Sequence, residues 1–319
     1  MDTLLLDETD TEAGPALTSD LAYIRLLLVN VFFVGERHAG DRKWVLVDAG
    51  LHGTASRIAE AAAERFGEDS RPVAIILTHG HFDHIGALAD LARRWDAPVY
   101  AHRLEMPYLT GRSAYPPPDP TVGGGAMALL SPLYPSGPFD FRGMVRALPE
   151  DNTVPGLPDW RWIHTPGHAP GHVSLFRERD RALIAGDAFV TTRQESAIAV
   201  ITQRPEMHGP PAYFTPDWRS ARRSVEMLAR LRPAIVATGH GRPLSGEGVR
   251  ESLDQLAAEF DEVAVPRRGR YVGRPAVMDD RGTVSVPPSA GNPLARAAVG
   301  AAVALALVLA LRKMRRQRA

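Results

Sequence analysis

The sequence predicts a mixed α/β (α+β) fold, and three observations support this class. Short apolar or β-rich runs alternate with helical patterns through the first hundred residues, an order that is typical of layered α/β domains. Similar strand-like and helical patterns resume between residues 160 and 263. The 319 residues are 45% hydrophobic and 23% charged, which is ordinary for a globular protein and excludes a disordered chain.

The first half of the chain is expected to alternate strands with helices. The expected strand regions are 21–34, 44–47, 73–77 and 99–101. The first region is long enough for one or two strands, and residues 73–77 fit a fully buried strand. An Ala-rich helix is expected over 54–66, where Gly67 ends it, and a second helix over about 85–95.

The second half adds four further strands and two longer helices. The expected strands are 160–164, 173–176, 182–184 and 234–237. The second and third of these are expected to form a hairpin across residues 177–180. One helix follows from the spacing of Val225, Leu228 and Leu231, and another over 248–263 from a similar apolar stripe.

Composition divides the chain into a folded body with distinct ends. Residues 1–19 form an acidic leader, and the body spans 20–265. Within the body, residues 104–158 form a Pro/Gly-rich insert with little periodicity, which we expect to be a lid or a substrate loop. An ordered surface excursion with no role in binding is the alternative for the insert. Pro, Gly and Arg dominate 266–293, which is therefore expected to be a linker.

The formal net charge of zero hides two charged ends. Residues 1–13 hold five acidic and no basic residues, whereas residues 294–319 hold six basic and no acidic residues. The body between them is almost balanced, which argues against a nucleic-acid partner, because such proteins present a basic face to phosphates. The absence of Cys excludes disulfides, thiolate metal ligands and a Cys nucleophile.

The C-terminal segment predicts contact with a membrane. Residues 297–311 carry no polar side chain and a basic stretch follows, so we expect a transmembrane or membrane-anchor helix over 294–312 and a basic tail over 313–319. An apolar run of this length falls short of the ~30 Å hydrocarbon core, so spanning and surface attachment both stay open. Because the acidic N-terminal flank does not resemble a secretory signal, we expect a cytoplasmic body that is membrane-associated through this segment. A buried core helix is the alternative.

Three histidines and an aspartate follow the expected strand 73–77 within six residues: His79, His81, Asp83 and His84. Imidazole and carboxylate groups suit divalent metals of the zinc type. These side chains cannot all reach one tetrahedral ion comfortably, so His79 with His81 and Asp83 with His84 offer ligands to two neighbouring ions. Three later strand ends supply further candidates: His168, Asp187 and His240. The carboxyl ends of strands are where α/β folds place their sites.

The run from His79 to His84 reads HGHFDH, and with the other strand ends it resembles the metallo-β-lactamase superfamily. The supporting segments occur in the family's order and are DAG at 48–50, TPGH at 165–168, GD at 186–187 and GHG at 239–241. The pattern covers roughly residues 20–262 and looks like the glyoxalase II branch. The resemblance implies that 20–265 is a catalytic domain with a four-layer αββα sandwich, the metals lying at one edge between two sheets.

The resemblance also implies a role for each residue of the pattern. His79, His81 and His168 would hold a first metal; Asp83, His84 and His240 would hold a second, and Asp187 would bridge them. The implied ions are two divalent metals, zinc first, with iron or manganese also used by relatives of this type. Asp48 would orient a ligand histidine, a turn-forming Asp being the alternative. His172 is not assigned to the metal.

These residues together predict a hydrolase acting on a small molecule. A hydroxide shared by two ions would attack an ester, thioester, lactone or amide carbonyl, with Asp83 and Asp187 fixing its orientation. The mainly uncharged insert favours an apolar substrate, and Tyr213 and Trp218 could touch it, core packing being the alternative. An iron-dependent persulfide dioxygenase on the same fold and a non-enzymatic metal-binding scaffold are the competing functions. The sequence predicts neither the substrate nor an oligomeric state.

Overall fold

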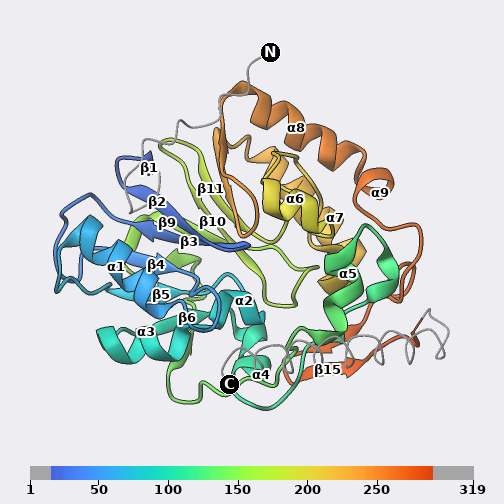
Figure 1. The fold of residues 1–319 in the computed structure, drawn as a ribbon, viewed down its shortest axis with the longest axis horizontal. Helices are drawn as coiled ribbons and strands as arrows, with labels where there is room; N and C mark the ends of the chain where they lie inside the picture. The colour runs from blue at the N-terminus through green and yellow to red at the C-terminus, as the bar shows by residue number, and fades with distance from the viewer. Residues whose placement is uncertain (1–15, 290–319) are drawn as a thin grey trace, which may run out of the picture.

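Two β-sheets pack face to face in the computed structural model, and helices cover the outer face of each (Figure 1). The structure describes residues 16–289. Helices α1 (Ala55–Phe66) and α3 (Leu88–Trp95) cover the first sheet, and α7 (Trp218–Arg230) and α8 (Glu247–Ala258) cover the second. These are the four αββα layers that the sequence resemblance implied.

The first sheet has seven strands within the described residues, and its strands follow one another in sequence order. They are β1 (Ala16–Thr18), β2 (Leu21–Leu26), β3 (Val29–Val34), β4 (Val45–Val47), β5 (Ala74–Ile76), β6 (Val99–Ala101) and β7 (Val145–Ala147). Strands β1 to β4 pair antiparallel, whereas β4 to β7 pair parallel. The carboxyl ends of β4 and β5 therefore open onto the same edge of the sheet.

The second sheet has six strands in the described part of the chain, in the order β13-β12-β11-β10-β9-β8. They are β8 (Thr153–Val154), β9 (Leu157–His164), β10 (Val173–Arg177), β11 (Ala182–Gly186), β12 (Ile235–Thr238) and β13 (Leu244–Ser245). The expected hairpin is confirmed, because Leu175 pairs with Ile184 across β10 and β11. Strands β11 and β12 are parallel, so they too end at one edge.

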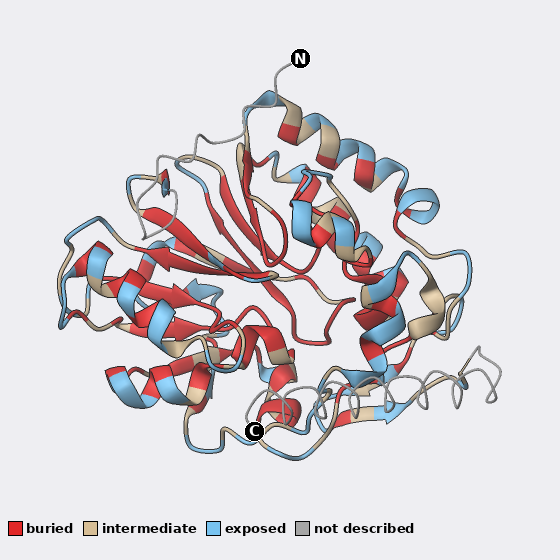
Figure 2. Cartoon of the chain, in the orientation of Figure 1, coloured by how far each residue is buried: buried red, intermediate tan, exposed pale blue. Residues whose placement is uncertain are grey.

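Three apolar clusters separate the four layers. One joins α1 and α3 to the outer face of the first sheet, for example Ile58 and Leu91 against Leu46. A second joins α7 and α8 to the second sheet. The third lies between the sheets and brings Phe32 together with Leu175. Both sheets are accordingly buried on their two faces, as Figure 2 shows, which is why their strands read as continuous apolar runs.

The helix expected over about 85–95 begins three residues later, as α3 at Leu88, and a separate helical turn, α2 (Phe82–Ile85), precedes it. Between them the N–H groups of Gly86 and Ala87 donate to the carbonyls of Gly50 and Ala49, at 2.7 and 3.1 Å. The backbone thus bonds to the turn after β4 instead of continuing one helix, and this ties the HGHFDH segment to the DAG segment.

The insert over 104–158 is more ordered than its composition predicts. It holds short helices: part of η1 (Arg103–Glu105), α4 (Met106–Leu109), η2 (Pro120–Val122), α5 (Ala126–Leu130) and η3 (Ser131–Leu133). Its last third supplies β7 and β8, which lie at the edges of the two sheets. The remaining short elements are α6 (Ala197–Thr202), η4 (Ala212–Phe214) and α9 (Phe260–Val263), where the helix expected over 248–263 breaks at Glu259.

The segment expected to be a linker packs against the body as far as residue 289. Strands β14 (Val277–Asp279) and β15 (Gly282–Ser285) form a hairpin there. Tyr271 is buried, and its hydroxyl donates to the carbonyl of Pro117 at 2.6 Å. Thr283 also contacts the insert, because its N–H donates to Ser113 Oγ at 3.0 Å. The segment has the composition of a linker, but the buried Tyr271 and these hydrogen bonds attach it to the body.

Several expectations fall on the ends of the chain. The leader expected over 1–19 lies outside the described residues except for its end, where residues 16–18 form β1. The expected helix over 294–312 and basic tail over 313–319 lie outside them entirely. Within residues 16–289, no helix is both long and apolar enough to cross a membrane.

Candidate metal centre

The HGHFDH segment is held by the ends of β4 and β5. Asp48, directly after β4, accepts hydrogen bonds from the N–H and the hydroxyl of Thr78. Thr78 Oγ1 in turn lies 3.1 Å from His79 Nδ1. His81 precedes α2, whose first turn carries Asp83 and His84. Four candidate ligands therefore leave the first sheet on one loop and one helical turn.

The second sheet supplies the other three candidates from separate strand ends. His168 follows β9, Asp187 comes directly after β11, and His240 follows β12. Gly239 lets the end of β12 approach Asp187 and His84 closely, because a Cβ at this position would overlap Asp187 Oδ1 and lie 2.7 Å from His84 Cε1. All seven candidates from the two sheets are buried.

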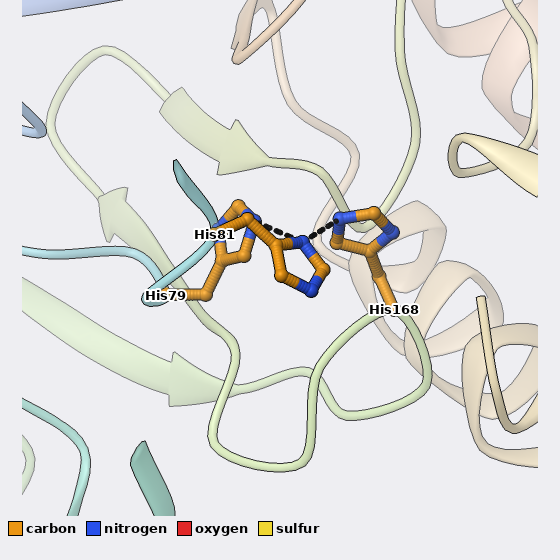
Figure 3. A group of neighbouring side chains, drawn as sticks. All are labelled: His79, His81 and His168. Carbon is orange, nitrogen blue, oxygen red and sulfur yellow. Dashed lines mark hydrogen bonds between the residues drawn. The ribbon is translucent and has the colours of Figure 1, made fainter. Parts of the chain in front are cut away.

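Three histidine rings converge at one side of the site (Figure 3). His79 Nε2 lies 3.0 Å from His81 Nδ1, and that same atom lies 2.9 Å from His168 Nε2. His79 and His81 come from the first sheet, whereas His168 comes from the second. The three ring nitrogens lie close enough together to hold one metal ion.

Asp83, His84 and His240 form a second group of ligand atoms at the other side. His240 Nε2 lies 3.5 Å from Asp83 Oδ2. Asp187 lies at the junction, because its Oδ2 atom is 3.0 Å from His240 Nε2, 3.6 Å from His84 Nε2 and 3.4 Å from His168 Nε2. A single carboxylate oxygen therefore contacts both groups.

The charges of the site are strongly coupled. Burial lowers the pKa of His79 and His168 well below the usual histidine value, with neighbouring imidazoles adding to the effect. Burial alone would raise the pKa of Asp187, but His240 and His84 hold it well below its usual range. The first group thus favours neutral imidazoles, the form that binds metals, and Asp187 favours the carboxylate.

Two further side chains support these ligands through hydrogen bonds. Asp48 Oδ2 lies 2.8 Å from His84 Nδ1, which is the contact that its expected orienting role requires. His172, which we did not assign to the metal, lies neither in these two groups nor in the third group of ligand atoms among the described residues, which overlaps them and consists of His79, His84 and Asp187. Its Nε2 atom instead accepts the N–H of Asp187 at 2.8 Å, and its Nδ1 atom lies 2.8 Å from Thr165 Oγ1. Sequence reasoning missed this contact, because its donor is a backbone group.

The two aromatic residues expected near the substrate separate in the structure. Tyr213 lies beside the site in a cluster with Phe214, whose ring stacks on His81 at 4.7 Å. Trp218, by contrast, packs in the core under α7, 6.3 Å from Phe260 between ring centroids. Trp218 is therefore a core residue, which was the alternative to substrate contact. The first turn of α7 directs its side chain toward α8 and α9.

Comparison with known protein families shows which superfamily includes this chain. The sequence model of the metallo-β-lactamase superfamily matches residues 24–240. The chain belongs to this superfamily. Among curated members, a probable metallo-hydrolase of Bacillus subtilis, YflN, is 48% identical over 236 residues, covering 74% of this chain and 89% of YflN. Another, YybB of the same organism, is 28% identical and covers 68% of this chain and 82% of YybB.

Solved metallo-β-lactamase structures share the fold at low sequence identity. A β-lactamase domain protein of Burkholderia ambifaria superposes with a TM-score of 0.53 at 20% identity, covering 80% of this chain and 79% of that protein. Superfamily membership and the relatives confirm the expected enzyme class, a metal-dependent hydrolase of the metallo-β-lactamase fold. The glyoxalase II branch, the metal number and the substrate stay predictions.

Proposed function

We propose that this metallo-hydrolase is a binuclear enzyme that cleaves an apolar ester, thioester or lactone. The observation that carries the proposal is the position of Asp187 Oδ2, within 3.0–3.6 Å of ring nitrogens from both ligand groups. A carboxylate at such a junction suits two ions that share one ligand. Five imidazoles and two carboxylates form a donor set suited to zinc, with iron and manganese as alternatives.

The residues fit such ions because polar atoms at the site lack other partners. Asp187 Oδ1 and His84 Nε2 are both buried, and neither makes a hydrogen bond within the described residues. An unpaired buried polar atom costs about 1–3 kcal/mol. His81 Nδ1 also faces ring nitrogens of two other histidines, although one nitrogen of a neutral imidazole carries either a single hydrogen or a single lone pair. Cations between these atoms would remove both conflicts.

When bound, two divalent ions would lower the pKa of a water molecule and polarise a substrate carbonyl. The protein's own groups would position the reactants. Asp83 and Asp187 are hydrogen-bond acceptors at the second ligand group, so they can orient an attacking water. The Tyr213 hydroxyl makes no hydrogen bond within the described residues, and burial, together with the charge of Asp83, raises its pKa well above the usual value. Tyr213 therefore stays protonated and can donate to a substrate oxygen.

An aromatic wall beside the ligands supports an apolar substrate. It consists of Phe82, Tyr134, Tyr213 and Phe214, with Met127 packed against it. Phe82 stacks on Tyr134 at 5.6 Å between ring centroids, so the insert and α2 share this surface. We propose that this wall receives the acyl part of the substrate, which gives the insert the substrate-loop role expected for it.

Metal analysis combined with a substrate panel tests the proposed function. Full-length protein should bind two zinc ions per chain and hydrolyse at least one apolar ester, thioester or lactone, and a chelator should abolish the activity. Asp187→Asn should reduce both metal content and hydrolysis. One iron per chain with persulfide-dependent oxygen uptake would instead establish the dioxygenase, and bound metal without hydrolysis across the panel would establish a scaffold.

A further inference from the structure

Glu105 is a buried carboxylate that belongs to neither ligand group. It lies at the end of η1, at the start of the insert, and its side chain has no solvent exposure. Burying a lone carboxylate is costly unless hydrogen bonds compensate it. The hydrogen-bond partners of Glu105 therefore indicate what compensates the cost of burying its carboxylate.

Both oxygens of Glu105 accept backbone hydrogen bonds from the two loops that carry the histidine ligands. Oε2 accepts the N–H of Gly80 at 2.8 Å, and Gly80 lies between His79 and His81. Oε1 accepts the N–H of Gly171 at 2.7 Å, in the loop that follows His168. One rigid carboxylate thus fixes the distance between the first-sheet loop and the second-sheet loop.

Tyr115 completes this arrangement from the insert. Its hydroxyl donates to Glu105 Oε2, and its ring lies against His81 with centroids 4.7 Å apart. Tyr108 stacks on the Tyr115 ring with centroids 4.1 Å apart. Three donors therefore surround the carboxylate of Glu105. Burial raises its pKa, and these three hydrogen bonds oppose that effect.

The glycines of the two loops are explained by the same contacts. A Cβ at Gly171 would lie 2.8 Å from both the Cγ and the backbone N of Glu105. A Cβ at Gly80 would overlap the Tyr115 hydroxyl and lie 2.8 Å from Leu109 Cδ2. Both loops thus approach the Glu105–Tyr115 pair so closely that a side chain at either position would push them away.

We propose that Glu105, assisted by Tyr115, is a positioning residue that sets the spacing of His79 and His81 relative to His168. The proposal rests on the proposed metal centre and deepens it. It assigns the first part of the insert to assembly of the three-histidine group rather than to substrate contact. Asp83, His84 and His240 make no hydrogen bond to this pair, so the second ligand group should depend on it less.

Zinc affinity of the full-length protein tests the proposal. In Glu105→Gln, an amide NH₂ replaces one acceptor oxygen and meets a backbone N–H that can no longer be bonded. Groups that support metal ligands through hydrogen bonds commonly change metal affinity by about 10- to 100-fold. We therefore expect the affinity for the zinc ion held by His79, His81 and His168 to fall by this factor. Chelator competition measures this loss, and the absorption spectrum of the Co²⁺-loaded protein should change as the histidine geometry relaxes.

Asp119→Asn is the matched control. Asp119 is also a buried carboxylate, and it accepts the backbone N–H groups of Thr121 and Arg270. Its replacement should lower the melting temperature without changing either zinc affinity or the Co²⁺ spectrum. If Glu105→Gln behaves in the same way, with zinc affinity within about twofold of wild type, Glu105 has only a structural role and the proposal is overturned.

Two further outcomes are distinguishable. If Glu105→Gln does not fold, Tyr115→Phe replaces it as the test, because it keeps both rings stacked and removes only one donor. We expect it to weaken zinc binding at the three-histidine group by a few-fold, and unchanged affinity would overturn the proposal. If the wild-type chain binds no divalent metal, the proposed function itself fails and the positioning role fails with it.

Discussion

The Nε2 atom of His172 accepts a hydrogen bond from the backbone N–H of Asp187 across 2.8 Å. The bond joins the loop after β9 to the end of β11, and it fixes the residue proposed to bridge two ions. His172 is fully buried, and burial lowers its pKa to about 3, so the ring stays neutral and keeps an acceptor nitrogen for this bond. A histidine outside the ligand groups therefore holds in place the aspartate that is proposed to bridge the two ions.

Replacing His172 by Phe should weaken metal binding while preserving the shape of the ring. The Asp187 N–H would then lose its acceptor, and we expect zinc affinity to fall by about 10- to 100-fold. Chelator competition measures the change. His52→Phe, at an exposed turn residue, is the control and should bind zinc as tightly as wild type. Equal affinities for the two variants would contradict the role given to His172.

Gly239→Ala should disrupt the site from its backbone side. The added methyl group would overlap Asp187 Oδ1 and crowd His84 Cε1 at 2.7 Å, so we expect loss of the second ligand group and at least a tenfold fall in hydrolysis. Gly248→Ala in the first turns of α8 is the control, because Ala is favoured over Gly in a helix by up to about 1 kcal/mol. Metal content measured after gel filtration should separate the two variants, and full metal occupancy in Gly239→Ala would refute the steric argument.

The stability of the protein should fall in mild acid partly through His102. Burial, with the adjacent ring of His164 at 4.3 Å, lowers the pKa of His102 to about 4. The unfolded chain therefore takes up a proton near pH 6.5 before the folded chain does, and stability decreases as pH falls from 6.5 toward 4. His102→Asn, which keeps an acceptor for the N–H of Leu104, removes this effect.

Urea unfolding at pH 7.5 and pH 5 measures the difference. On lowering the pH, wild type should lose about 1–2 kcal/mol more free energy of unfolding than His102→Asn. The same pH-dependent loss in both proteins would show that His102 does not contribute.

Arg177 should contribute far more stability than an exposed arginine. Its guanidinium is almost fully buried, pairs with Asp20 and Asp180 at 2.6 Å each, and lies over the ring of Trp160 at 4.6 Å. Arg177→Leu leaves Asp180 without this cation and Asp20 with only the exposed Arg179, and we expect the free energy of unfolding to fall by about 3 kcal/mol. Arg222→Leu removes an exposed pair with Asp261 and should cost at most about 1 kcal/mol. Similar losses in urea unfolding would contradict this ranking.

Two truncations should separate the folded body from the expected membrane segment. Ending the chain at residue 289 removes residues 290–319, and this fragment should keep the metal centre and leave the membrane fraction. Ending it at residue 265 also removes Tyr271 and the β14–β15 hairpin, whose contacts hold the insert. We expect a lower melting temperature for the shorter fragment. Equal melting temperatures would restore the linker interpretation of 266–289.

The ligand candidates could be predicted because they are polar residues at the ends of apolar strands. His79, His168, Asp187 and His240 each follow such a strand, and the fold brings those ends together. The alternation of strands and helices predicted the α/β class, whereas the order of the four layers came from the family resemblance. The seven residues that the family pattern implies as ligands lie together in the structure, where they form three overlapping groups of ligand atoms among the described residues; their roles at a metal stay predictions.

Other features could not be predicted, because backbone groups carry them. Glu105 and His172 bond to N–H groups of distant loops, and no residue type marks such a partner. The break after α2 likewise comes from carbonyls of the turn after β4. Trp218 shows that the sequence can also suggest a contact that the structure does not make. It is close in sequence to residues near the site, but its side chain packs in the core.

The division of the ligands between two sheets has a consequence for how the molecule assembles. One half of the chain supplies His79, His81, Asp83 and His84, and the other supplies His168, Asp187 and His240. A bound ion would act as a cross-link between the halves and would stabilise their docked state by its binding free energy. Tight metal uptake would then have to wait for the two sheets to meet, so the ion would report that folding is complete.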